Sequence, residues 1–135
     1  MAQIETRVER TMDLCLFTVQ GQVTVPEVHT ALEQFYAQGP TLNALWDFTE
    51  TDAAALTADD LRAIVELARS KAPHRPGGRT ALVVHGDFSF GMARMYEILA
   101  EVGEHPITHG VFRSRDEAFR WLTGTQEVTQ DGDDT

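Results

Sequence analysis

Apolar and polar residues alternate in some parts of the chain, and apolar residues recur every three or four positions in others, which predicts a series of strands and helices. The first two strand-like stretches, 4–10 and 14–20, are separated by only three residues, as in a β-hairpin. The stretches 42–48 and 80–84 are short and continuously apolar, which is typical of strands covered on both faces. A last strand is predicted over 107–113.

Helical spacing of apolar residues predicts four helices between and after these strands. The first begins at Thr24, which is followed by Pro26 and Glu27 in the pattern of a capping box, and Gly39 ends it. Thr57 begins the second helix, with acidic residues in its first turn. The third helix is predicted to follow the break at 85–87, with Met92, Met95, Leu99 and Val102 on its buried side, and the fourth is predicted over 114–124.

The predicted order of elements is β-β-α-β-α-β-α-β-α, which is typical of an α/β fold with right-handed crossovers. We therefore expect a mixed, mostly parallel sheet that is opened by a hairpin and packed against four helices. A chain of 135 residues, of which 42% are hydrophobic, suffices for one core. We expect a single domain over 1–124 and an acidic, disordered tail over 125–135.

Charge and composition exclude several classes of function. The formal net charge of −10 repels phosphate backbones, so nucleic-acid binding is not expected. The sequence has no apolar run of the roughly 20 residues that a membrane-spanning helix needs, and its start lacks the features of a signal peptide. We expect a cytoplasmic protein without integral membrane association. The single cysteine, Cys15, alternates with leucines and is interpreted as a packing residue.

Polar residues are expected at the edge of the sheet where the parallel strands end, because strand-to-helix connections gather there. We refer to this edge as the carboxyl edge. The candidates for a regulatory or binding site are Asp47, Thr49, Thr51, Thr57, His85, Asp87 and Ser89. Two interpretations remain open: these side chains cap helices and bind nearby backbone, or one hydroxyl accepts a phosphate next to a helix N-terminus.

A second candidate site is an apolar pocket beside residues 88–95. The residues proposed to line it are Phe88, Phe90, Met92 and Met95, and methionine gives such a pocket adaptable walls. Gly91 lowers helix stability by about 1 kcal/mol relative to alanine. Either the helix approaches the sheet closely at this glycine, or a ligand needs the space.

A third candidate is a basic loop that connects the second helix to the next strand. Its cationic residues are Lys71, His74, Arg75 and Arg79. A helix-to-strand loop lies at the edge opposite the carboxyl edge, so we expect this anion-binding loop to form a separate site.

Signals for catalysis and for metal or cofactor binding are weak. The sequence lacks the nucleophile elbow, the phosphate-binding loops and the zinc-binding helix motif, and its five histidines are dispersed. We expect no metal and no cofactor. The remaining enzymatic hypothesis is an acid-base pair formed by His85 and Asp87.

Several strings together resemble a known family, the small bacterial SpoIIAA-like (STAS/SEC14-like) domains. They are Leu45-Trp46-Asp47, the strand 80–84, the string 90–95 and the closing string 117–122, and the resemblance covers about 4–122. It implies a STAS-type sheet. In the anti-sigma-factor antagonists of this family, a serine or threonine that follows the strand matching 42–48 is phosphorylated, and the protein binds a kinase.

The present chain departs from that phosphorylation motif. It has Asp47-Phe-Thr-Glu50 where the antagonists have Asp-Ser-Ser/Thr-Gly, so Thr49, Thr51 and Thr57 are candidates by location only. The SEC14-like side of the resemblance implies an apolar ligand between helices and sheet.

These observations predict a non-enzymatic regulatory or binding module that binds a protein partner or a small ligand at the carboxyl edge. The first alternative is a carrier of an apolar or lipid-like ligand, held under 88–95. The second is an enzyme that uses His85 and Asp87. A homodimer formed through the edge strand of the first hairpin is also expected.

Overall fold

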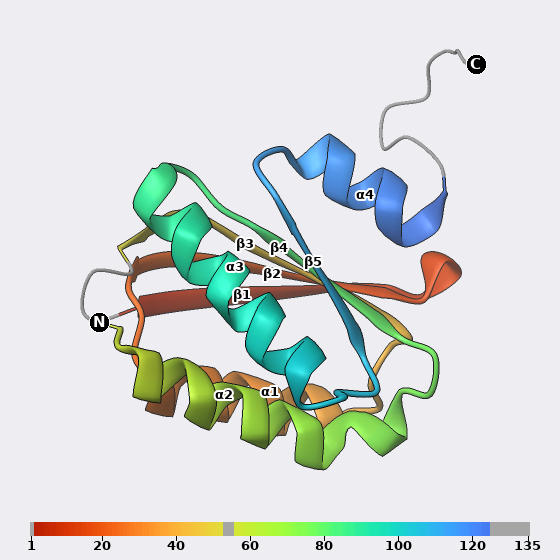
Figure 1. Cartoon of the computed structure of the whole chain (residues 1–135). Coiled ribbons are helices and arrows are strands. Elements are labelled where there is room, and N and C mark those ends of the chain that lie inside the picture. Colours follow the sequence, from red (N-terminus) through yellow and green to blue (C-terminus); the bar gives the residue numbers. More distant parts are fainter. Residues whose placement is uncertain (1, 53–55, 125–135) are drawn as a thin grey trace.

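The computed structural model describes residues 2–52 and 56–124, and the tail predicted over 125–135 lies outside these ranges. The described residues form five strands, four α-helices and two short 3-10 helices (Figure 1). The strands are β1 (Ala2–Glu9), β2 (Leu14–Gln22), β3 (Asn43–Asp52), β4 (Arg79–Val83) and β5 (Thr108–Phe112). The helices are α1 (Val25–Ala37), α2 (Ala58–Lys71), α3 (Asp87–Val102) and α4 (Arg115–Thr123), with η1 (Arg10–Met12) and η2 (Ala72–His74).

The five strands form one sheet in the order β1-β2-β3-β4-β5. β1 pairs with β2 in antiparallel orientation, and all later neighbours are parallel. The mixed, mostly parallel sheet with four packed helices is therefore confirmed. Helices α1, α2 and α3 cover one face of the sheet, which we call the three-helix face, and α4 covers the other, the α4 face (Figure 1).

The alternation of side chains along β3 shows how one strand serves two cores. Ala44 and Trp46 point to the three-helix face, where Trp46 stacks on Phe17 with ring centroids 3.9 Å apart. Leu45 packs on the α4 face with Leu16 and its neighbours. A strand buried on both faces has no polar side in its centre, which explains why this stretch is continuously apolar.

One element boundary differs from the prediction by several residues. β3 continues to Asp52 rather than ending at Phe48, because Glu50, Thr51 and Asp52 go on pairing with β2 after β4 has ended. Thr49 and Thr51 therefore lie in a strand and not in a loop. Helix α3 begins at Asp87, directly after the predicted break, since the chain turns at Gly86 with a φ of 87° and enters the helix at once.

Candidate functional site

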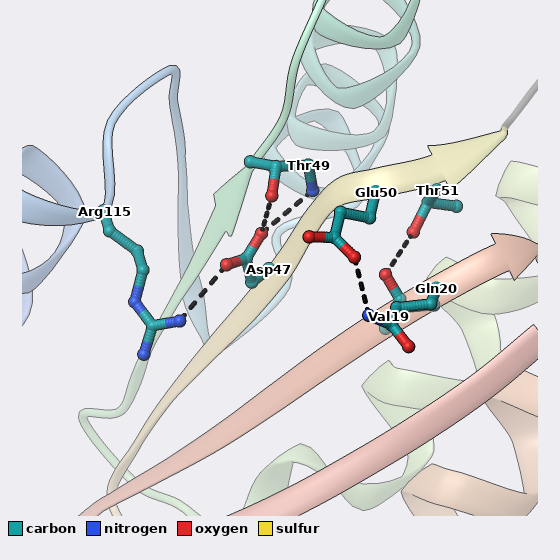
Figure 2. Close-up of polar contacts among 7 residues, drawn as sticks. All are labelled: Val19, Gln20, Asp47, Thr49, Glu50, Thr51 and Arg115. Atoms are coloured by element: carbon teal, nitrogen blue, oxygen red, sulfur yellow. Dashed lines mark hydrogen bonds and ion pairs between the residues drawn. The ribbon is translucent and has the colours of Figure 1, made fainter.

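The buried carboxylate of Asp47 organises one part of the carboxyl edge (Figure 2). Its Oδ1 accepts hydrogen bonds from the Thr49 backbone N–H at 2.9 Å and the Thr49 hydroxyl at 2.6 Å. Its Oδ2 lies 3.2 Å from Nη1 of Arg115, at the start of α4. The Asp47–Thr49 contacts lie within β3, where its register with β2 shifts, and the Arg115 contact links β3 to the start of α4. Asp47 therefore has a structural role on the α4 face.

The other predicted edge residues do not join this cluster. The Thr57 hydroxyl accepts from the backbone N–H of Asp60 and completes the capping box of α2. The exposed carboxylate of Asp87 pairs with Arg113 at 3.1 Å, and not with His85, which is itself exposed. The geometry brings no acid-base pair together from His85 and Asp87.

Thr51 and Ser89 lie on the three-helix face instead. The Thr51 hydroxyl donates to the carbonyl of Val19 at 2.9 Å (Figure 2). Both residues contribute to the lining of a cavity between the sheet and helices α1, α2 and α3. The polar residues of the carboxyl edge therefore divide between the two faces of the sheet.

The cavity has a volume of about 120 Å³. Its walls are mostly apolar and come from the sheet and from all three helices of that face. They include Val28, Leu32, Ile64, Leu82, Val84 and Met92. The lining reaches from Thr51 and Ser89 at the carboxyl edge to Arg75 and His105 at the opposite edge. The cavity therefore runs along the strands from one of these edges to the other.

Helix α3 presents a different side to this cavity from the one the sequence predicted. Of the four residues proposed for an apolar pocket, Met92 lines the cavity, and Ser89, Ala93 and Tyr96 line it from the same helix. Phe88 and Met95 are exposed, and Phe90 lies under the guanidinium of Arg113, 4.1 Å from its ring centroid. Gly91 is exposed, and an added Cβ there would meet no atom within 4 Å, so close approach to the sheet is not the reason for this glycine.

Arg75 lies at the end of the cavity opposite the carboxyl edge, which we call the inner end. Its side chain is buried, with 5% exposed, and its guanidinium donates to the carbonyls of Thr41, Leu42 and Arg79 at 2.9–3.1 Å. Nη1 lies 3.4 Å from the hydroxyl of Tyr36. No acidic side chain pairs with Arg75 in the described part of the chain.

Two histidines lie beside Arg75, and sequence analysis did not assign either of them to a site. The rings of His105 and His109 meet edge to face at 4.8 Å, and Tyr96 packs on His109 at 5.2 Å. Burial, His105 and Arg75 lower the pKa of His109 to about 3, so its ring is neutral at neutral pH. The sequence does contain a signal for His109, because residues two apart in a strand share one face, and His109 lies between the apolar residues Ile107 and Val111 in this spacing.

The other three cationic side chains of the basic loop have different partners from those of Arg75. Lys71 pairs with Glu33 at 3.3 Å, and His74 is exposed beside the ring of Tyr36. The side chain of Arg79 reaches the α4 face, where it stacks on Trp121 and donates to the Trp121 carbonyl at 2.7 Å. The loop therefore does not gather its four cationic residues around one anion.

Other chemistry in the described residues is limited. Burial raises the pKa of the Cys15 thiol to about 11, which keeps it protonated and unreactive at neutral pH. No group of three or more potential metal ligands occurs within 2–52 and 56–124. Among the same residues, no helix is both long and apolar enough to cross a membrane.

Comparison with known proteins identifies the fold. No family model and no curated protein matches the sequence. Among solved structures, an uncharacterized Shewanella loihica PV-4 protein of the DUF3478 family, with a SpoIIAA-like fold, is 20% identical, with a TM-score of 0.55. The alignment covers 90% of this chain and 93% of that one.

Two anti-sigma factor antagonists are also similar in structure. One is from Mycobacterium paratuberculosis, with a TM-score of 0.61 and 14% identity over 90% of this chain and 94% of that one. The other is SpoIIAA in its unphosphorylated form, with a TM-score of 0.56 and 12% identity over 91% and 100%. The protein therefore has a SpoIIAA-like, STAS-type fold, which confirms the fold that the resemblance implied.

Proposed function

We propose that this protein is a non-enzymatic binding module that holds a small apolar ligand between the sheet and helices α1, α2 and α3. The observation that carries the proposal is the cavity of about 120 Å³ with mostly apolar walls. Protein interiors are close-packed and contain few voids larger than a water molecule. An apolar occupant would remove the apolar walls from water, which favours binding.

The volume limits the size of the ligand. An engineered apolar cavity of about 150 Å³ in another protein binds benzene. The present cavity matches one aromatic ring or a short alkyl chain, and it is too small for the acyl chain of a membrane lipid. This narrows the lipid-like ligand predicted from the sequence to a much smaller molecule.

Titration with toluene, followed by the amide resonances of the isotope-labelled protein, tests the proposal. We expect shifts confined to the residues around the cavity, together with an increase in Tm. Ala93→Leu is the matched variant, because Ala93 lines the cavity and a leucine there fills it. Saturating toluene that shifts no cavity resonance, or shifts those of Ala93→Leu equally, contradicts the proposal.

A second candidate function is binding of a protein partner at the carboxyl edge. It is favoured by the two anti-sigma factor antagonists among the similar structures and by the exposed ring of Phe88, 59% accessible at the start of α3. Thr49, which is exposed, and Thr57 are the accessible hydroxyls of that edge. Phosphopeptide mapping of the protein from its native host tests this function, and Thr49, Thr51 and Thr57 unmodified under all growth conditions would count against a phosphorylation switch.

A further inference from the structure

We propose that the ligand is a small apolar carboxylic acid whose carboxylate binds at the inner end of the cavity, beside Arg75, Tyr96 and His105. The inference rests on the proposed function, because it assigns a chemical class to the same occupant. It concerns the end of the cavity at the start of β4 and β5, away from the carboxyl edge. Three features of that end point to an anion.

The first feature is an arginine without an acidic partner. Arg75 is buried and lines the cavity, with its guanidinium over the ring of Phe35. Among the described residues, it donates hydrogen bonds only to carbonyl groups and to the Tyr36 hydroxyl. Hydrogen bonds to neutral groups satisfy most of its donors, but they do not neutralise its positive charge. No described residue of the cavity lining is acidic, so a bound carboxylate would supply the missing negative charge.

The second feature is a pair of buried nitrogen atoms without partners. Nδ1 of His105 accepts from the backbone N–H of Ile107 at 3.1 Å, so the neutral ring carries its hydrogen on Nε2. That Nε2 is buried and has no hydrogen-bond partner, and neither has Nδ1 of His109, a residue that is only 9% exposed. A buried donor without a partner costs about 1–3 kcal/mol, which a ligand oxygen at His105 would offset.

The third feature is the balance of donors and charges around this end. Tyr36 from α1, Tyr96 from α3 and Arg75 bring donors, and His109 is neutral at neutral pH. From α2, Arg69 and the exposed Glu66, which pair with each other at 3.7 Å, also act on His105. Donors and one full positive charge favour a monoanion, and the apolar remainder of the cavity favours a hydrocarbon body of about one ring.

Binding of matched acids and neutral analogues to the wild-type protein, measured by isothermal titration calorimetry, tests the inference. The probes are benzoate against benzamide and hexanoate against hexanol. We expect each acid to bind roughly 10- to 100-fold more tightly than its neutral analogue, since hydrogen bonds to a charged group are stronger. Neutral analogues that bind equally well or better overturn the inference and leave the proposed function intact. If neither class binds and toluene shifts no cavity resonance, both fail.

Variants then locate the carboxylate. Arg75→Gln and Arg79→Gln make the same charge change in the same loop, but the Arg79 side chain lies on the α4 face. We expect Arg75→Gln to abolish the preference for acids and Arg79→Gln to retain it. Because Arg75 also holds backbone carbonyls, Tyr96→Phe is the second variant, and it removes only a hydroxyl. We expect it to weaken acids roughly three- to tenfold while neutral analogues bind unchanged.

Intermolecular nuclear Overhauser effects give the orientation independently of any variant. We expect the ring proton ortho to the carboxylate of benzoate to lie near the rings of Tyr96 and His109. An orientation with the carboxylate toward Thr51 and Ser89, or an acid preference that survives in both Arg75→Gln and Tyr96→Phe, overturns the inference.

Discussion

The two faces of the sheet use similar residues to different ends. On the α4 face, Arg79 and Asn43 donate to the carbonyls of Trp121 and Leu122, so the last turn of α4 is bonded to the sheet. On the three-helix face, Arg75 also binds carbonyls, but it borders a cavity. Within 2–52 and 56–124, all three buried side-chain nitrogens without a partner belong to Arg69, His105 and His109, on the three-helix side.

The difference indicates where the protein keeps spare binding capacity. A single short helix is held on one face by a close apolar core and by polar contacts at both of its ends. Three longer helices cover the other face, where the cavity lies and where side-chain nitrogens of Arg69, His105 and His109 lack a partner. On the α4 face, polar groups already have partners, so a ligand would add few contacts. On the three-helix face, a ligand could fill the cavity and bind the nitrogens that lack a partner.

The largest expected effect comes from equal truncations on the two faces. Leu122→Ala removes a buried side chain from the α4 face, and Leu82→Ala removes one that borders the cavity. We expect losses in the free energy of unfolding of about 4 kcal/mol for Leu122→Ala and about 2–3 kcal/mol for Leu82→Ala, because Leu82 has fewer packing partners to lose. Urea denaturation measures both, and equal losses would remove the contrast in packing.

Acid should destabilise the three-helix face through His109. The unfolded chain takes up a proton below the ordinary pKa of 6.5, whereas the folded protein does so only near 3. Folding stability is therefore lost as the pH falls from 6.5 toward 3, at up to about 1.4 kcal/mol per pH unit for this residue. His105, whose pKa burial and Arg69 also lower, adds to the slope.

His109→Phe separates this contribution from that of other groups. It keeps a ring against Tyr96 and removes the titration, so we expect a shallower loss of stability between pH 6.5 and about 5. Phe35→Leu is the control, because it changes a buried side chain of the same face without removing a titratable group, and it should retain the wild-type slope. An unchanged slope in His109→Phe would show that this histidine is not held neutral by the fold.

Enlarging one alanine on each face sharpens the comparison further. Ala118→Leu inserts a larger side chain into the α4 face, where Ala118 is fully buried, and overpacking should cost about 1–3 kcal/mol. Ala93→Leu extends into the cavity, and we expect a change within about 0.5 kcal/mol. Thermal unfolding measures both, and a comparable loss in the two variants would mean that the cavity cannot accept added volume.

The smallest effect is expected for the ion pair at the edge of the α4 face. A double-mutant cycle with Asp47→Asn and Arg115→Gln should give a coupling energy of about 0.2–1 kcal/mol that decreases in high salt. The more exposed pair Asp59 and Arg62 on α2 is the control, with a smaller coupling. A larger coupling for the control would show that burial of Asp47 does not strengthen its pair.

Local sequence signals predicted most of the fold. The capping boxes at Thr24 and Thr57 fixed two helix starts, because the side chains that bind the first free amides are short-range neighbours. The predicted end of β3 was wrong because residues 49–52 are polar, and their pairing with β2 depends on a partner some 30 residues away. Alternation of apolar residues does not record that kind of pairing.

The candidate site was harder to predict for a related reason. Arg75 was recognised as cationic, but its burial depends on carbonyls of the loop before β3, which no local pattern connects to it. The apolar string 88–95 was recognised, yet the side of α3 that faces the core is set by contacts with β5 and α2. Tyr96, His105 and His109 meet only after α3 has packed against β5, with His105 in the connection between them.

The positions of the two tryptophans on opposite faces of the sheet have a spectroscopic consequence. Trp46 lines the cavity, whereas Trp121, the only other tryptophan of the sequence, packs under Arg79 on the opposite face. Each side of the sheet therefore carries its own intrinsic fluorophore. Trp121→Phe would leave a single emitter at the cavity wall, and Trp46→Phe a reference that is separated from any occupant by the sheet itself.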